Sequence, residues 1–422
     1  MNFYLGIDFG TSGARAIAID RQGNIIETQQ SSFGNIPSNK LATAWQDTLF
    51  ELIVQISVPV RKNLRAIAIN GTSSTVLLCN AVGKVITEPL LYNDSRGKTV
   101  LEQIKSIAPN NHVVVSATSS LAKLIWWSEQ TYFSEARYIL HQADWLAYLL
   151  HGKLGISDYH NALKLGYDVD NLCYPDWLQY RAFSHLYPQV LTPGKSIDKV
   201  LKVNCDRLNL PDNCIVKAGT TDSIAAFLAS GASQPGEAVT SLGSTLVLKL
   251  LSRTKVTAAK FGIYSHKLGK LWLVGGASNT GGAVLKHFFT DKQLTRLSLQ
   301  VNPDLVSSLN YYPLLAPGDR FPINDPNLQP QLEPRPNEPA EFLHGLLESM
   351  SRIEALGYQK LQNFSSEQLT IVYTAGGGAH NAVWQKIRQR YLKVPVRSAQ
   401  KTEAAYGTAL LALERFLDLL NI

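Results

Sequence analysis

The clearest candidate for chemistry is an acidic residue placed just before a turn of small polar residues. Asp8 closes an apolar run, Gly10-Thr11-Ser12-Gly13 reverse the chain, and a second apolar run follows. Glycine lets backbone N–H groups approach an anion, and the Thr and Ser hydroxyls add donors. A carboxylate beside a phosphate is repelled unless a cation such as Mg²⁺ lies between them. The motif predicts a phosphate and Mg²⁺ site, but an ordinary hairpin turn has the same composition.

The same plan recurs about half a chain later. Residues 237–251 contain an apolar run, the turn Gly243-Ser244-Thr245 and a further apolar run, with Leu242 where the first copy has its acid. Two strand–turn–strand hairpins of this kind predict a duplicated domain. Each half would carry one phosphate-holding turn, and only the first would lie beside a metal.

Two further glycine-rich turns follow predicted strands and open predicted helices. One spans residues 275–282 and includes Thr280 and Gly281, and the other is Gly376-Gly377-Gly378. A helix start offers unpaired N–H groups and a positive dipole end to an anion. The P-loop and dinucleotide-binding fingerprints are absent from the sequence. Each turn alone suits a connecting loop, but four of them at strand ends favour a nucleotide site.

A second acid occupies a position suited to catalysis. Asp222 follows Gly219-Thr220-Thr221 at the end of an apolar run and precedes an apolar helix. Asp is a common helix N-cap residue. A kinase also needs a carboxylate that orients the attacking hydroxyl and accepts its proton. Both roles are compatible with this position.

Two more segments contain side chains that suit either ligand binding or an ordinary structural role. Asn93-Asp94-Ser95-Arg96 follow a short apolar run and suit either hydrogen bonds to several hydroxyls or a turn with an exposed Asp–Arg pair. Trp384 follows the turn at Gly376–Gly378 at a helical spacing and suits either contact with an adenine or core packing.

The elements around these motifs alternate in type. We expect strands near 3–8, 14–20, 24–32 and 64–70, with a helix near 38–57. The second half repeats strands at 237–251, 261–265, 271–275 and 369–375, with helices near 338–363, 379–391 and 403–420 and a long loop over 311–337. This order predicts mixed α/β layers, with a domain boundary near 205–215.

Composition narrows the class further. A chain of 422 residues predicts two or three domains, and its net charge of +7 is scattered rather than clustered. This charge suits either a bland surface or an anionic small-molecule substrate, and we expect no nucleic-acid partner. The four cysteines lack metal-binding spacing, and no apolar stretch is long enough to cross a membrane. We expect a cytoplasmic protein without a membrane partner, or one of the plastid stroma if a transit peptide has been removed.

The ordered set of motifs resembles the FGGY carbohydrate kinases, sugar kinases of the actin/hexokinase/chaperone ATPase fold. The matching pieces run along nearly the whole chain: residues 6–12, 92–96, 144–152, 157–162, 219–222, 241–245, 312–320, 376–384 and 403–409. Each piece is short, and the resemblance rests on their order and spacing.

The resemblance implies an α/β fold of two actin-like (ribonuclease H-like) domains, 1–210 for sugar and 211–422 for ATP, flanking a deep catalytic cleft. It implies that Asp222 is the catalytic base and that Asp8 lies near Mg²⁺ and the reacting hydroxyl. Asp8, Ser73, Asp94 and Asp222 would contact the sugar. The nucleotide contacts would be Thr11, Ser12, Gly13, Gly243, Ser244, Thr245, Thr280, Gly281, Gly376, Gly377, Gly378, Asn381 and Trp384.

Departures from the family pattern bear on the substrate. The chain is short, and it reads Asn70-Gly-Thr-Ser-Ser-Thr where glycerol and xylulose kinases usually carry other sugar contacts. This resembles the plant and cyanobacterial branch of D-ribulose kinases. We expect MgATP-dependent phosphorylation of the terminal hydroxyl of D-ribulose by a monomer or homodimer, with D-xylulose as the alternative sugar. An actin-like or chaperone-like ATPase switch without sugar chemistry is the alternative of another class.

Overall fold

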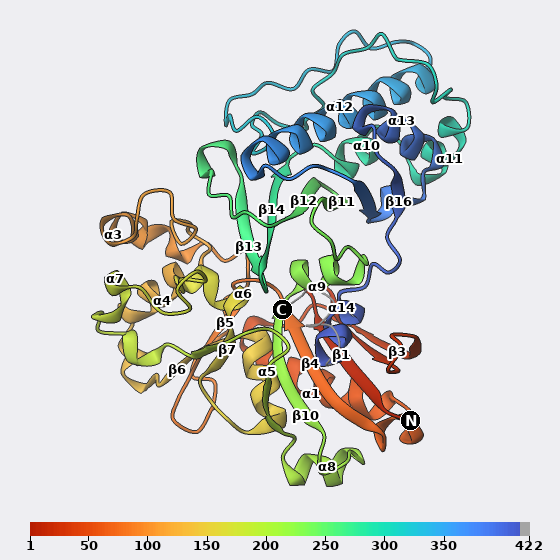
Figure 1. The fold of residues 1–422 in the computed structure, drawn as a ribbon. Coiled ribbons are helices and arrows are strands. Elements are labelled where there is room, and N and C mark those ends of the chain that lie inside the picture. Colours follow the sequence, from red (N-terminus) through yellow and green to blue (C-terminus); the bar gives the residue numbers. More distant parts are fainter. Residues whose placement is uncertain (414–422) are drawn as a thin grey trace. The chain divides into compact units, whose positions relative to one another are not determined.

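The computed structural model describes residues 1–413, which form two compact units. Residues 1–229 and 403–413 make the first unit, and residues 230–402 make the second (Figure 1). The division differs from the boundary predicted at 210/211. Strand β10 (Ile215–Thr221) pairs with β4 (Leu64–Gly71) in the first sheet, and helix α9 (Asp222–Ala229) follows it directly. Asp222 therefore belongs to the first unit, and the expectation that it lies in the second domain was wrong.

The first unit is built on a six-stranded sheet of order β3-β2-β1-β4-β10-β9. Besides β4 and β10, its strands are β1 (Phe3–Phe9), β2 (Gly13–Ile19), β3 (Ile25–Ser32) and β9 (Ser196–Lys199). The three central strands β1, β4 and β10 run parallel, so their carboxyl ends share one edge. The predicted strands at 3–8, 14–20, 24–32 and 64–70 are confirmed.

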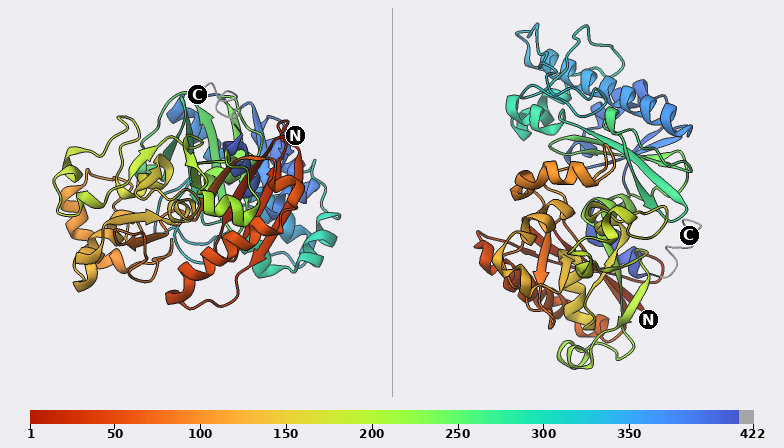
Figure 2. Two further views of the ribbon diagram at one scale, coloured as in Figure 1. Left: turned by 90° about the horizontal axis from the view of Figure 1, so that it is seen from below. Right: turned by 90° about the vertical axis from the view of Figure 1, so that its left-hand side faces the viewer.

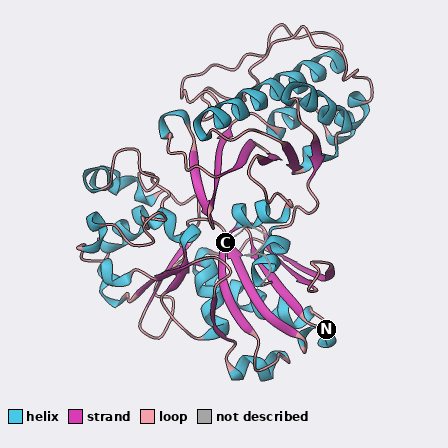
Figure 3. Ribbon diagram, viewed as in Figure 1, coloured by secondary structure: helices cyan, strands magenta, loops and turns pink. Residues whose placement is uncertain are grey.

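Helices cover both faces of this sheet, which explains its nearly continuous apolar strands (Figure 3). Helix α1 (Leu41–Gln55) shares a core with one side of β1. On the other side α14 (Ala404–Ala412) crosses β1 so closely that a Cβ at Gly6 would lie 2.1 Å from the Ala405 carbonyl oxygen. Residues 404–412 thus return to the first unit. The predicted helix at 403–420 is present from residue 404 to 412, and its remaining residues lie outside the described range.

Residues between β4 and β9 add a lobe with its own apolar core. Its strands form two short pairs, β5 (Val76–Cys79) with β6 (Tyr138–His141) and β7 (Ile156–Asp158) with β8 (Gln189–Leu191). Its helices are α3 (Leu101–Ile107), α4 (Ser120–Ser128), α6 (Tyr159–Ala162) and α7 (Asp176–Gln179). Helix α5 (Gln142–His151), in the same stretch of chain, packs instead against β4 and β10 and shares the core of the six-stranded sheet. The short helices α2 (Val58–Arg61) and α8 (Lys202–Leu208) complete the unit.

The second unit repeats the arrangement of the first. Its sheet has the order β13-β14-β12-β11-β15-β16, so β14-β12-β11-β15-β16 reproduces β3-β2-β1-β4-β10. The strands are β11 (Glu237–Leu242), β12 (Leu246–Ser252), β13 (Tyr264–Leu268), β14 (Leu271–Ser278), β15 (Ile371–Ala375) and β16 (Val396–Ser398). The predicted duplication is confirmed at the level of strand order.

The strand register corrects one detail of the repeat. Phe9 pairs with Ala14 as the last pair before the first turn, and Leu242 pairs with Leu246 as the last pair before the second. Leu242 therefore corresponds to the buried Phe9. Ser241, rather than Leu242, takes the place of Asp8.

Four helices complete the second unit: α10 (Gly282–Phe288), α11 (Asp291–Ser298), α12 (Pro339–Ser365) and α13 (Ala382–Leu392). The long α12 runs along the sheet in the views of Figures 1 and 2 and shares the apolar core of the unit. Turns and isolated bridges fill residues 301–337, which include the predicted loop.

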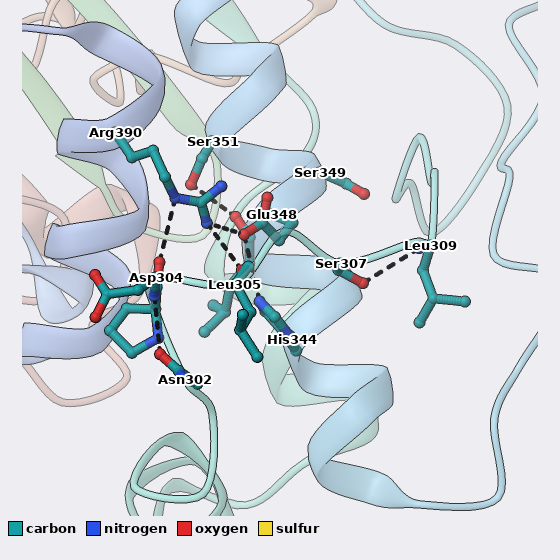
Figure 4. A network of polar contacts seen from close by, with 12 residues as sticks. Asn302, Asp304, Leu305, Ser307, Leu309, His344, Glu348, Ser349, Ser351 and Arg390 are labelled. Atoms are coloured by element: carbon teal, nitrogen blue, oxygen red, sulfur yellow. Dashed lines mark hydrogen bonds and ion pairs between the residues drawn. The ribbon is translucent and has the colours of Figure 1, made fainter.

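A buried carboxylate ties this loop to the helices (Figure 4). Glu348 of α12 is fully buried and accepts hydrogen bonds from Arg390 and, at 2.5 Å, from the Tyr391 hydroxyl. The Arg390 guanidinium also donates to the carbonyl oxygens of Pro303 and Leu305, each at 3.2 Å. A buried charge needs such partners, and these partners hold the loop against α12 and α13.

Candidate active site

The first unit gathers its candidate residues at one edge of its sheet. Asp8 is level with Asn70 of β4, and Asn70 is level with Thr220 of β10, two residues before Asp222. Ligands of α/β sheets bind outside the carboxyl ends of parallel strands. The predicted motifs at Asp8 and Asp222 are thus brought to the same edge of the sheet, on the two strands that flank β4.

Electrostatics show that these two carboxylates affect one another. The pKa of Asp8 is raised to about 7, mainly by burial and also by the negative charge of Asp222. The charge of Arg15 and a hydrogen bond from Asn70 act in the opposite direction. Asp8 Oδ1 is also buried without a hydrogen-bond partner in the described part of the chain. A buried, unpartnered carboxylate oxygen is the kind of ligand that Mg²⁺ takes, so Asp8 fits the predicted metal role.

Asp222 is the first residue of α9, and its carboxylate makes a local hydrogen bond. Its Oδ1 accepts a hydrogen bond of 2.7 Å from the backbone N–H of Ser223. The strand before it is held by Thr220, whose hydroxyl lies 2.7 Å from His160 Nδ1. The carboxylate bond goes to the next residue along the chain, whereas an N-cap accepts from the second or third helical N–H, so the N-cap role of Asp222 stays a prediction beside the catalytic one.

The first glycine turn is open to binding. The Gly10 N–H donates to the Gly13 carbonyl oxygen at 2.9 Å, and Thr11 and Ser12 between them are exposed. Within residues 1–413, the backbone N–H groups of Thr11 and Ser12 donate no hydrogen bond to the protein. A Cβ at Gly13 would lie 2.4 Å from the Ser31 carbonyl oxygen, so only glycine allows this approach to β3.

A cavity of about 490 Å³ adjoins this turn, wholly within the first unit. Its polar lining includes Thr11, Thr72, Tyr92 and Gln142, and its apolar lining includes Trp45. Of the predicted sugar contacts, Ser73 directly follows Thr72 and is half-buried. Asp94 lies two residues beyond Tyr92, and its Oδ2 pairs with the Arg96 side chain at 3.1 Å. Neither Ser73 nor Asp94 lines this cavity, so their contact with a sugar remains a proposal.

Sequence reasoning missed a buried lysine beside this cavity, and a half-buried one, Lys164, whose pKa is affected by Asp222. Lys123 of α4 is fully buried, and its Nζ donates to the carbonyl oxygens of Ser74 at 2.7 Å and Leu91 at 2.6 Å. Burial lowers the pKa of Lys123 to about 7, and the charge of Asp94 partly offsets this effect. Burial also lowers the pKa of Lys164, with Asp222 acting against it. A lysine within the apolar run of residues 121–127 was the available signal.

In the second unit, two of the predicted turns pack directly against one another. The Gly282 N–H donates to the Gly243 carbonyl oxygen at 2.8 Å, and the Ala283 N–H donates to that of Ser244 at 3.0 Å. Gly281 has φ 145 and ψ -157, a conformation that only glycine adopts readily. A Cβ on Gly281 would lie 2.7 Å from the Thr245 carbonyl carbon.

The third turn of this unit joins the same group. Gly376 has φ 83, and a Cβ there would lie 2.7 Å from the Leu242 carbonyl oxygen, whereas a Cβ on Gly377 would meet no atom within 4 Å. The backbone N–H groups of Ser244 and Thr245 donate no hydrogen bond within the described residues. Together the turns form a backbone cradle of the kind that binds phosphates.

The two side chains after Gly378 differ in position. Asn381 caps α13 by accepting from the Trp384 N–H at 3.0 Å, and it donates to Ser298 Oγ at 2.9 Å. Trp384 is only 3% exposed, packs in the core of the unit, and donates its indole N–H to Ser351 Oγ at 3.2 Å. The structure therefore supports the core alternative for Trp384 and not the adenine contact, because the neighbouring core already covers its ring.

Within residues 1–413 there is no cluster of three or more His, Cys, Asp or Glu side chains able to hold a metal ion. Among the same residues no helix is long and apolar enough to cross a membrane.

The repeated sheet order and the glycine turns define an actin-like ATPase fold. The chain matches a xylulose kinase structure from Brucella ovis with a TM-score of 0.85 at 21% identity, covering 100% of this chain and 91% of that one. Residues 3–229 match the N-terminal domain of the FGGY family of carbohydrate kinases, and residues 238–414 match its C-terminal domain. The chain therefore belongs to the FGGY family, and it is a sugar kinase.

The chain is also similar to kinases that are named for different sugars. A xylulose kinase of Staphylococcus epidermidis is 21% identical over 97% of this chain and 87% of its own length. A D-ribulokinase of Saccharomyces cerevisiae is also 21% identical, over 97% of this chain and 71% of its own. These relatives agree on kinase activity and differ in their sugar.

Proposed function

We propose that this kinase transfers the γ-phosphoryl group of MgATP to the terminal hydroxyl of a keto-pentose, and that the sugar is D-ribulose. The observation that carries the proposal is the Asp8–Asp222 carboxylate pair at the shared edge of β1, β4 and β10. A sugar kinase needs one carboxylate for the hydroxyl proton and a second acid near the metal and phosphates. The cavity at the same edge offers space for the sugar.

Different residues of the first unit have different roles in this transfer. Asp222 orients the acceptor hydroxyl and takes its proton as the new oxygen–phosphorus bond forms. Asp8 would hold Mg²⁺, which when bound neutralises the charge of the phosphates. The free N–H groups of Thr11 and Ser12 would donate to phosphate oxygens.

The second unit supplies nucleotide contacts in this proposal. The N–H groups of Ser244 and Thr245 and the turns at Thr280–Gly281 and Gly376–Gly378 form its backbone cradle. Asn381 stands at the start of α13 next to that cradle and would contact the adenosine. We leave Trp384 out of the proposed contacts because it is a core residue.

The choice of D-ribulose rests on the chain after β4. Gly71-Thr72-Ser73-Ser74-Thr75 presents short hydroxyl side chains beside the cavity, and Ser73 is the proposed sugar contact. Short hydroxyl groups suit a small polyol, but one or two hydrogen bonds separate epimers. D-xylulose is therefore the second candidate, favoured by the xylulose kinases among the relatives.

A coupled assay of ADP release tests the proposal with D-ribulose, D-xylulose, L-ribulose and glycerol as acceptors. We expect the highest kcat/KM with D-ribulose. A higher kcat/KM with D-xylulose than with D-ribulose would make D-xylulose the substrate and leave the proposed mechanism unchanged. ATP hydrolysis that none of these sugars stimulates would contradict the proposal and favour a nucleotide-driven switch.

A further inference from the structure

Gln142 is a buried polar residue that faces the cavity of the first unit. It is the first residue of α5, its side chain is 1% exposed, and it lines the cavity together with Thr72 and Tyr92. Its backbone N–H donates to the Thr75 carbonyl oxygen at 2.9 Å. No role for it follows from the glycine turns or from the two catalytic carboxylates.

The orientation of the Gln142 amide is set by its partner. Its Oε1 accepts from the Thr72 backbone N–H at 3.1 Å and lies 3.3 Å from the Thr72 hydroxyl. A backbone N–H can only donate, so the side-chain atom it meets must be the carbonyl oxygen, not the amide nitrogen. The Nε2 hydrogens therefore point away from Thr72. Within residues 1–413 no hydrogen bond from Nε2 to the protein is present.

The surroundings hold this group in place. The hydroxyls of Thr72 and Thr75 are 2.5 Å apart, and a Cβ at Gly71 would lie 2.8 Å from Gln142 Oε1. His141, the preceding residue, is held on both ring nitrogens, by Asp144 at 3.0 Å and by Ser120 at 3.1 Å.

Lys123 fixes the two adjoining segments of the cavity wall. It links the carbonyl oxygens of Ser74 and Leu91, so the segments that carry Thr72 and Tyr92 are joined. A polar group held in place by several neighbours is suited to recognise a particular ligand atom, because it loses little conformational entropy when the ligand binds.

We propose that Gln142 determines sugar specificity by donating an Nε2 hydrogen bond to an acceptor oxygen of the sugar. The assignment rests on the proposed function of this cavity as the sugar site. The group it recognises is a carbonyl or hydroxyl oxygen away from the hydroxyl that is phosphorylated. A buried donor rejects analogues that leave it unpaired, so Gln142 favours an acceptor longer than glycerol.

The test compares Gln142→Glu and Gln142→Leu with wild type in the full-length enzyme. Glutamate keeps an oxygen for the Thr72 N–H but places a second acceptor where Nε2 was, whereas leucine removes the polar group at similar size. The control is Gln103→Glu, the same change on an exposed residue of α3. Thermal unfolding identifies which variants fold, and kcat/KM is measured for D-ribulose, D-xylulose, ribitol and glycerol.

We expect Gln142→Glu to lower kcat/KM for the ketoses about 10- to 100-fold, mostly through KM for the sugar. Ribitol, which has a hydroxyl donor in place of the carbonyl, should lose less, and KM for ATP should stay within twofold. Ketose kcat/KM within threefold of wild type in a folded variant, with unchanged ratios among the sugars, overturns the role of Gln142 alone. A wild-type enzyme that no sugar stimulates overturns the proposed function and this assignment together.

Discussion

The turns at Gly10–Gly13 and Gly243–Thr245 end corresponding strands of two sheets with the same order, yet they differ in chemistry. The first has Asp8 two residues before it, whereas the second has Ser241 at the matching register. Both candidate catalytic carboxylates belong to the first unit. The repeated scaffold thus has a glycine turn with unbonded backbone N–H groups in both copies and candidate catalytic acids in one.

The turns also differ in how they are supported. Thr11 and Ser12 are exposed beside a cavity. Gly243 and Ser244 instead have their carbonyl oxygens bonded by Gly282 and Ala283, and Gly376 approaches Leu242. The second turn is therefore packed against glycines elsewhere in the chain, whereas the first is supported by its own Gly10–Gly13 hydrogen bond and by Gly13 against β3.

The largest effect should come from Asp222→Asn. Asparagine can still accept the Ser223 N–H bond but cannot take a proton, so we expect kcat to fall by up to about 10⁴-fold. Nucleotide binding, measured by calorimetry without sugar, should stay within threefold. Asp47→Asn, an exposed carboxylate in α1, is the control. Near-full activity of Asp222→Asn would assign Asp222 to helix capping alone.

Asp8→Ser makes the first turn resemble the second at the matching position. Loss of the acid should lower kcat/KM by about 10²- to 10³-fold, because several kcal/mol of charge stabilisation depend on the metal. The response to Mg²⁺ concentration should weaken as well, and steady-state kinetics across Mg²⁺ concentrations measures both. Ser241→Ala in the second copy is the matched variant and should change kcat/KM less than threefold. Equal effects of the two variants would refute the asymmetry between the copies.

Gly281→Ala tests the packed support of the second turn. Its Cβ would lie 2.7 Å from Thr245, in a backbone conformation that costs alanine about 1–3 kcal/mol. We expect the KM for ATP to rise about tenfold, which corresponds to 1.4 kcal/mol, with little change in the KM for sugar. Gly34→Ala in the first unit is the control, since a Cβ there also meets no atom within 4 Å. A normal KM for ATP in a folded Gly281→Ala enzyme would show that this turn has no role in nucleotide binding.

The smallest effect concerns pH and the charged surroundings of the first cavity. The pKa of Lys123 is lowered from 10.5 to about 7, so the unfolded chain binds more protons between these values. The free energy of unfolding should therefore rise as pH increases from 7 toward 10. Lys123→Met should reduce this rise by about 1–3 kcal/mol. Urea unfolding at pH 7.5 and 9.5 measures it, with the exposed Lys98→Met as control. The same pH slope in both variants would show that folding does not lower the pKa of Lys123.

Much of the fold was predictable because its signals are local. Apolar runs predicted the hairpins at 3–19 and 237–252, and the strand order confirmed their duplication. The boundary at 210/211 failed because β10 pairs with β4, about 150 residues earlier along the chain, and no local pattern records that pairing. Trp384 failed as an adenine contact because its burial depends on α12, from which Ser351 accepts its indole N–H.

The sequence by itself determined which residues could do chemistry: an acid before a glycine turn, a second acid at a helix start, and a repeat of the turn without the acid. Residue type and neighbours within a few positions are enough for these features, since turn and cap preferences are local. Only the tertiary structure decided that Asp8 and Asp222 share one sheet edge, that the last helix returns to the first unit, and that Gln142 faces the cavity. Those outcomes depend on parallel strand pairing and close packing between segments far apart in the sequence. All the contacts of the folded chain together decide which segments pair and pack.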